Sequence, residues 1–240
     1  MSSMHKVIIY LKMSAKALVG QPSLNTVQGI VKFFPSWVKH LVPGKNSLTD
    51  AQPWLSFGAI EFLKSILSAN MNVFEYGSGG STLFLAARAK QVISVEHDKQ
   101  WFTNMKTELS KRGIDNIEYL YVPSESDSQF NKKYFGNPDD YISSDILYKG
   151  ENFESYVKII DRYPENFFDL VIVDGRARPS CIKHALPAIK AGGYLVVDNS
   201  ERKYYLDKFR LDKTKWEKRV FNGAVPYNLH FSETTILRKR

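Results

Sequence analysis

Small and acidic residues with the spacing of a nucleotide-binding loop occur in one stretch of the chain. Residues 75–82, EYGSGGST, follow an apolar run and precede a helix-like segment. Glycine adopts positive φ at little cost, so the backbone can approach a ligand closely, and the first N–H groups of a helix can bind an anionic group. Glu96 ends the next apolar run, where a carboxylate can accept hydrogen bonds from both hydroxyls of a ribose. These features indicate a site for a nucleoside-containing ligand.

The glycine spacing departs from the dinucleotide fingerprint G-x-G-x-x-G, because its third position is Thr82. A glycine there lets the helix and the strand pack closely beneath a pyrophosphate. The loop therefore favours a nucleoside ligand without a pyrophosphate. An NAD(P)-dependent oxidoreductase is kept as an alternative.

A second set of polar residues follows two later apolar runs. Asp174 comes after the first of them, and Asp198 and Asn199 come after the second. Two carboxylates and an amide oxygen form a hard-oxygen set that suits Mg²⁺. Arg176 and Arg178 stand beside Asp174 and suit a carboxylate or phosphate on a substrate, since a guanidinium stays protonated and is a poor base. The sequence thus predicts a reacting end with Asp174 and Arg176, and a magnesium site at Asp174, Asp198 and Asn199.

Histidine is the side chain best suited to proton transfer near neutral pH. His97, His184 and His230 are the candidates, and His184 is taken as a candidate catalytic residue together with Asp174 and Arg176. A structural role explains each of the three histidines more simply than a catalytic one.

Seven apolar runs with strand character position these residues. They lie at 71–76, 91–98, 117–122, 167–175, 194–200, 216–223 and 233–240. Helix-like segments separate them near 54–70, 81–90, 99–113, 153–163, 181–193 and 203–213. This alternation predicts an α/β fold, a doubly wound and mostly parallel seven-stranded sheet with an antiparallel C-terminal strand. The carboxyl ends of its parallel strands would bring the polar residues to one edge.

The ends of the chain differ from its middle. Residues 1–50 carry six lysines and one acid, and their prolines and glycines predict only short helices, near 7–18 and 26–41. We interpret 1–50 as an N-terminal helical extension, a cap or an oligomerisation arm, and 51–240 as the ligand-binding domain. Basic ends would also favour an anionic partner.

Four of these motifs, in this order, resemble those of class I S-adenosylmethionine (SAM)-dependent methyltransferases. VFEYGSGGST is similar to the first motif of the family, and VISVEHD to its acidic second-strand motif. FDLVIVDG and AGGYLVVDN resemble the fourth- and fifth-strand motifs, and the two final strands resemble the closing antiparallel hairpin. The resemblance covers roughly residues 53–240 and implies SAM as the cofactor.

The resemblance also implies roles for individual residues. The residues expected at the cofactor are Glu75, Gly77, Ser78, Gly79, Ser81, Thr82, Glu96, His97, Asp98 and Asp174. Gly77, Ser78 and Gly79 would line the methionine part, and Glu96 would bind the ribose. His97 and Asp98 would flank the adenosine, and the stretch 124–127 would hold the adenine. Trp101 is expected in the core, with a wall for the adenine as the alternative.

The fourth- and fifth-strand motifs also resemble the metal site of catechol-type O-methyltransferases. In that group a lysine three positions after the first aspartate serves as the base, whereas this chain has Ala177 there. That difference weakens the Mg²⁺ hypothesis. A loop at 124–150 carries Tyr134, Phe135, Tyr141 and Tyr148, which could cover a substrate.

The sequence therefore predicts a methyltransferase acting on a small, anionic molecule at oxygen. Nucleic-acid and protein methyltransferases are the alternatives. A nucleic-acid partner is disfavoured because the fourth strand is followed by Asp-Gly-Arg-Ala instead of an Asn/Asp-Pro-Pro-aromatic run. The single cysteine, Cys181, and the lack of a long apolar segment lead us to expect a cytoplasmic protein without a membrane span.

Overall fold

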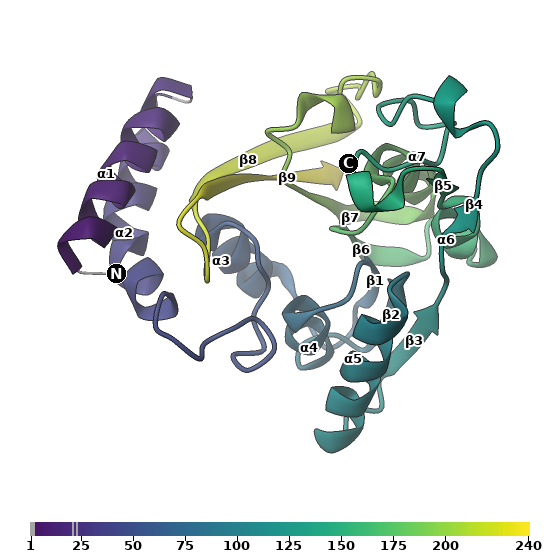
Figure 1. Cartoon of the computed structure of the whole chain (residues 1–240), viewed down its shortest axis with the longest axis horizontal. Helices are drawn as coiled ribbons and strands as arrows, with labels where there is room; N and C mark the ends of the chain where they lie inside the picture. The colour runs from purple at the N-terminus through teal and green to yellow at the C-terminus, as the bar shows by residue number, and fades with distance from the viewer. Residues whose placement is uncertain (1–2, 21, 23) are drawn as a thin grey trace.

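One mixed sheet runs through the centre of the molecule, with helices on both of its faces (Figure 1). The computed structural model of the chain describes residues 3–20, 22 and 24–240. The strands of the main sheet are β1 (Asn72–Tyr76), β2 (Gln91–Glu96), β3 (Ile117–Tyr121), β6 (Phe168–Val173), β7 (Ile189–Asp198), β8 (Trp216–Ala224) and β9 (Phe231–Lys239). A separate small sheet pairs β4 (Glu125–Ser126) with β5 (Glu151–Asn152).

The strand order is β3-β2-β1-β6-β7-β9-β8. The first five strands are parallel, and β9 runs antiparallel to both β7 and β8. The predicted doubly wound sheet with an antiparallel C-terminal strand is therefore confirmed. The order reverses between β1 and β6, and the carboxyl ends beside such a reversal are where open α/β sheets bind ligands.

Helices complete the two outer layers. They are α1 (Ser3–Gly20), α2 (Leu24–His40), α3 (Phe57–Ile66), α4 (Gly80–Ala86), α5 (Lys99–Lys111), α6 (Glu154–Val157) and α7 (Arg178–Ala188). Short 3₁₀ turns are η1 (Phe130–Lys132), η2 (Ile146–Tyr148), η3 (Lys158–Arg162) and η4 (Lys203–Tyr205).

Alternate side chains of each buried strand enter different cores. In β1, Phe74 and Tyr76 pack with residues of α6 and α7, whereas Val73 packs with residues of α3 and α4. Successive side chains of a strand point to opposite faces, so a strand covered on both sides must be apolar throughout. The exception in β1 is Glu75, which is completely buried.

The N-terminal helices pack onto the rest of the chain. Figure 1 shows α1 and α2 together at one end of the molecule, beside β8 and β9. The Tyr10 ring contacts Phe231, and Trp37, which is fully buried, donates its indole N–H to the carbonyl of Asn228 at 2.8 Å. The predicted division of the chain near residue 50 stays a prediction.

Two segments differ from the expected secondary structure. α1 and α2 are longer than the short helices predicted, and α2 continues through Pro35 because Trp37, just beyond it, is held in the core. The helix expected at 203–213 is only the turn η4. There Tyr205 stacks against Arg178, and Asp212 closes a turn by accepting from the Thr214 N–H. Every helix in the described part of the chain is too short or too polar to cross a bilayer.

We expect Trp37→Ala to lower the free energy of unfolding of the whole chain by about 3–5 kcal/mol, because it leaves a cavity and an unpaired carbonyl. Urea denaturation followed by circular dichroism measures this, and the exposed Val31→Ala in the same helix is the control, with an expected change below about 0.5 kcal/mol. A loss under about 1 kcal/mol would show that α2 contributes little to the stability of the sheet.

Candidate functional site

The loop after β1 passes very close to the backbone that follows β6. Gly77 has φ +88°, and a Cβ at this position would lie 2.8 Å from the Gly175 Cα and 2.9 Å from its nitrogen. Only glycine satisfies both the positive φ and the close approach. The Gly79 N–H donates to the Thr82 hydroxyl at 2.9 Å, which fixes the entry into α4. The sequence-predicted loop 75–82 is therefore a tight turn over the carboxyl end of the sheet.

Glu75 lies beneath this loop. Its Oε2 accepts hydrogen bonds from the hydroxyls of Thr82 at 2.6 Å and Ser94 at 2.7 Å, whereas its buried Oε1 has no partner. Ser94 is its neighbour in register on β2, and the Ser81 hydroxyl also faces the carboxyl group. Burial raises the pKa of Glu75 to about 7, against the opposing effect of these hydroxyls. A cation bound at the loop would favour the charged form.

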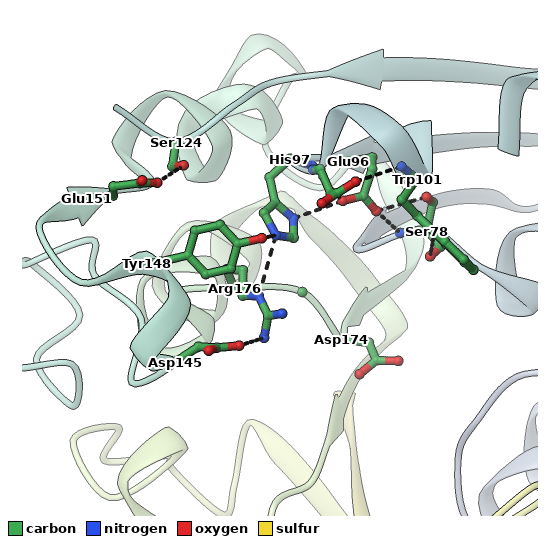
Figure 2. A network of polar contacts seen from close by, with 12 residues as sticks. Ser78, Glu96, His97, Trp101, Ser124, Asp145, Tyr148, Glu151, Asp174 and Arg176 are labelled. Atoms are coloured by element: carbon green, nitrogen blue, oxygen red, sulfur yellow. Dashed lines mark hydrogen bonds and ion pairs between the residues drawn. The ribbon is translucent and has the colours of Figure 1, made fainter. Parts of the chain in front are cut away.

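Glu96, at the end of β2, holds two loops together. Its Oε1 accepts from the backbone N–H groups of His97 and Asp98, both at 2.8 Å. Its Oε2 accepts from the Ser78 N–H at 3.1 Å and the Ser78 hydroxyl at 3.0 Å. Burial alone would raise the pKa of Glu96, but the hydrogen bonds from His97, Asp98 and Ser78 outweigh it and lower the pKa. The carboxylate is thus kept charged at the carboxyl edge of the sheet (Figure 2).

A cavity of about 510 Å³, here called cavity A, opens beside Glu96 and the glycine loop. Its walls come from the ends of β1, β2 and β6, from the start of α5 and from η2. Its lining residues are Gly77, Ser78, Glu96, His97, Asp98, Gln100, Trp101, Asn104, Tyr148, Asp174, Gly175 and Arg176. Six residues predicted to bind the cofactor, Gly77, Ser78, Glu96, His97, Asp98 and Asp174, therefore line one space.

Aromatic residues line cavity A on two sides (Figure 2). Trp101 is half-buried, and its indole N–H donates to the Ser78 carbonyl at 2.8 Å. The expectation that Trp101 belongs to the core was wrong, because this bond turns the ring toward the loop. Tyr148 places its hydroxyl 2.8 Å from His97 Nε2, and the Arg176 guanidinium lies over the Tyr148 ring while pairing with Asp145 at 2.9 Å. Arg176 Nε also lies 3.4 Å from His97 Nε2, and His97 Nδ1 lies 2.9 Å from Glu96 Oε1. Figure 2 shows these contacts leading from Asp145 through Arg176 and His97 to Glu96.

Two predicted cofactor contacts have mainly structural partners. Asp98 is exposed and caps α5, because its carboxylate accepts from the Trp101 N–H at 2.6 Å. The stretch 124–127, expected at the adenine, belongs instead to the small β4–β5 sheet and does not line cavity A. There Ser124 hydrogen-bonds to Glu151.

The predicted magnesium ligands surround an arginine. The Arg178 guanidinium donates to Asp174 Oδ1 at 2.9 Å and to Asn199 Oδ1 at 3.2 Å, and also to the Asp198 carbonyl. The Asp198 carboxyl group accepts from the Thr234 hydroxyl at 3.0 Å. A permanent cation thus holds the space between these residues, and the donor set does not fit Mg²⁺. Among the described residues, no group of three or more His, Cys, Asp or Glu side chains could hold a metal ion.

Asp174 and Asp198 interact with each other next to this arginine. Burial raises the pKa of Asp198 well above its usual value, and the charge of Asp174 adds to the effect, while Arg178 opposes it. Burial also raises the pKa of Asp174, although Arg178 counteracts it. Burial and the proximity of the two carboxyl groups therefore both favour protonation of one member of the pair. Arg178 is almost fully buried and already hydrogen-bonded to these groups, and the substrate-anion role expected for it stays a prediction.

Two further cavities adjoin cavity A. Cavity B, of about 340 Å³, shares Asp174 with it and is also lined by Trp54, Asp198, Asn199 and His230, among others. Cavity C, of about 650 Å³, shares Gly175 and Arg176 and reaches Phe135, Arg202 and Tyr204. Sequence reasoning missed Trp54, which no motif marks, and Arg202, which lies just before the segment 203–213 that was wrongly expected to be a helix.

His184 lies away from all three cavities. Its Nδ1 is 2.8 Å from Asp161 Oδ2 in η3, which packs against α7, and its Nε2 is 3.2 Å from the Tyr141 hydroxyl. The structure therefore does not bring this predicted catalytic residue to Asp174 and Arg176. Of the aromatic residues in the loop 124–150, Tyr148 lines cavity A and Phe135 lines cavity C, whereas Tyr134 and Tyr141 line none of the three.

Solved structures share this arrangement of strands. A proposed O-methyltransferase from Klebsiella pneumoniae is 15% identical, with a TM-score of 0.57 over 86% of this chain and 95% of that one. The O-methyltransferase TomG from Streptomyces achromogenes, solved with SAM, is 15% identical, with a TM-score of 0.52 over 87% and 97%. A proposed methyltransferase from Streptococcus mutans, solved with S-adenosylhomocysteine (SAH), is 16% identical, with a TM-score of 0.52 over 75% and 94%.

The chain has the class I methyltransferase fold. Among curated proteins, the ribosomal protein L11 methyltransferase of Clostridium perfringens is 28% identical over 99 residues, which cover 36% of this chain. The match spans only 32% of the length of that relative. No protein-family model matches the chain. Within the methyltransferase fold, cavity A lies at the carboxyl edge of the sheet, beside the first two strands.

Glu75→Gln tests the buried carboxyl group under the loop. The pKa of Glu75 in the folded chain, about 7, lies above its ordinary value of 4.5. The stability that the folded chain gains from protonated Glu75 is therefore fully present below pH 4.5 and is lost as the pH rises through 7. The difference in unfolding free energy, Glu75→Gln minus wild type, should therefore increase by about 3 kcal/mol from pH 5 to pH 8. Urea denaturation at both pH values measures the gain, with the partly exposed Glu108→Gln as control. An equal difference from wild type at both pH values would contradict the raised pKa.

Proposed function

We propose that this chain is a SAM-dependent methyltransferase that methylates a small molecule at oxygen. The observation that carries the proposal is cavity A, in which the glycine loop, the charged Glu96 and the anchored Trp101 lie around one space at the carboxyl edge of a methyltransferase-fold sheet. When bound, SAM supplies an electrophilic methyl group on a sulfonium.

The loop and Glu96 would hold the nucleoside and amino acid parts of the cofactor. Each oxygen of the Glu96 carboxylate already accepts two hydrogen bonds. The ribose hydroxyls would therefore take the place of the Ser78 hydroxyl, which has a second partner at 2.7 Å in Tyr119. Gly77 and Gly79 would let the backbone approach the methionine part.

Glu75 would interact with the cationic cofactor from beneath the loop, with Ser81 and Thr82 as its hydroxyl partners. Its unpartnered, buried Oε1 supports a cationic ligand, because a positive charge nearby stabilises the carboxylate that burial disfavours. Binding of the cationic cofactor at pH 6 would then release a proton from Glu75.

The adenine would lie against the ring of Trp101, with His97 and Tyr148 on the other side of cavity A. The indole is held in place by the Ser78 carbonyl, so little side-chain entropy is lost on binding. Asp98 would contribute mainly by capping α5, which positions Trp101. This position for the adenine replaces the one expected at 124–127.

Asp174 would serve the acceptor, because it lines both cavity A and cavity B. Burial raises the pKa of its carboxyl group, which makes it a stronger base toward an acceptor hydroxyl. Arg178 would position Asp174 through their hydrogen bond. Arg176 lines both cavity A and cavity C and would face an anionic group of the acceptor. The small volume of cavity B supports a small acceptor, whose positioning would supply much of the rate. We assign His184 no role in the proposed reaction.

Protein methylation is the second candidate, because of the similarity to a ribosomal protein L11 methyltransferase. That similarity covers about a third of either chain and does not decide the acceptor.

Transfer of label from [methyl-³H]SAM tests the function. We expect label in hydroxylated small molecules, at a rate unchanged by EDTA since Arg178 occupies the predicted metal position. Asp174→Asn should lower kcat about a hundredfold while SAM affinity changes only a few-fold, and the exposed Asp207→Asn is the matched control. Label found only in ribosomal protein or RNA would replace the small-molecule acceptor, and a requirement for Mg²⁺ would contradict the role given to Arg178.

A further inference from the structure

Exposed apolar side chains are concentrated at the start of the chain. Among the described residues, nine of the fourteen large exposed hydrophobic residues lie within the first 42 positions. Single exposed apolar residues are normal on a protein surface, but a cluster marks an interaction site. The cluster does not belong to cavities A, B or C.

On α1 these side chains form one stripe. Met4, Ile8, Leu11 and Val19 are spaced by whole helical turns, so they lie on one face, and Met4, Leu11 and Val19 are 75%, 61% and 86% exposed. The opposite face carries Tyr10, whose ring contacts Phe34, Trp37 and Phe231. α1 therefore uses one face for packing and presents a second apolar face outward.

On α2 the same pattern recurs. Leu24, Val27 and Val31 are exposed and spaced by about one turn, while Trp37 faces the core. Figure 1 places both helices at the end of the molecule beyond β8 and β9. Nothing in the described chain covers either stripe.

Positive charge borders these stripes. Residues 1–49 contain six lysines and no acidic residue. Lys12 stands four residues after Ile8, and Lys16 stands three before Val19, so both lie beside the stripe on α1. Lys32 pairs with Glu61 and Lys45 with Asp50, whereas the described chain offers no acidic partner to Lys12 or Lys16.

We propose that α1 and α2 bind the surface of an anionic lipid bilayer. A helix with an exposed aliphatic stripe and lysines at its border lies in the plane of the interface, with its apolar face among the acyl chains and its lysines at the headgroups. A second copy of the chain fits less well, because pairing two such faces would bring like charges together without an acidic residue between them. The proposal does not depend on the reaction.

Co-sedimentation with phosphatidylcholine vesicles, with and without phosphatidylglycerol, tests the proposal. The wild type should bind the anionic vesicles and bind neutral vesicles at least tenfold less. High salt should release it, because salt screens the attraction between the lysines and the charged headgroups. Leu11→Asp and the double variant Lys12→Glu/Lys16→Glu should each weaken partitioning about tenfold or more.

Matched controls separate the proposed surface from general effects. Leu147→Asp alters a leucine that is 79% exposed elsewhere, and Lys106→Glu/Lys111→Glu makes the same charge change on α5, so both should bind within about twofold of wild type. Unfolding midpoints equal to wild type show that the variants fold. Equal binding by wild type and the α1 variants would overturn the proposal. A dimer in vesicle-free sedimentation velocity that Leu11→Asp dissociates would also overturn it in favour of a second copy.

Discussion

The site depends above all on the carboxylate of Glu96 and the four hydrogen bonds that it accepts. Two come from Ser78, in the loop after β1, and two from the backbone of His97 and Asp98, in the turn after β2. One side chain therefore sets the positions of two loops from neighbouring parallel strands. Asp98 can then cap α5, and the cap directs Trp101 back to the Ser78 carbonyl, which closes the wall of cavity A.

A second constraint acts where β6 ends. Neither Gly77 nor Gly175 accommodates a side chain in this arrangement. A Cβ on Gly77 would lie 2.8 Å from the Gly175 Cα, and a Cβ on Gly175 would collide with the Tyr156 hydroxyl. The chain then turns at Ala177, with φ 45°, and α7 begins at Arg178. This left-handed turn brings the guanidinium between Asp174 and Asn199. Arg178 therefore supplies a positive charge beside the two carboxyl groups. Burial nevertheless raises the pKa of both Asp174 and Asp198.

The features that followed from sequence are those fixed by local chemistry and by periodicity. The glycines of 75–82 and the acid at position 96 have few structural alternatives, and the seven apolar runs define the sheet. The role of Arg178 could not be predicted, because it depends on the backbone turn at Ala177, and alanine gives no sign of positive φ. Trp101 could not be placed either, since an aromatic residue on an amphipathic helix suits a core equally well. At 203–213 helical propensity was overridden by the contacts of Tyr205 and the turn at Asp212.

Calorimetric titration of SAM, SAH and NAD into the wild type, Glu96→Ala and the control Glu108→Ala tests whether Glu96 binds the cofactor. We expect SAM and SAH to bind to the wild type and to Glu108→Ala. We also expect affinity to fall about tenfold to a hundredfold in Glu96→Ala, in line with the loss of a hydrogen bond to a charged group. NAD binding without SAM binding, or affinity for SAM and SAH that is unchanged in Glu96→Ala, would contradict the proposal that Glu96 binds SAM.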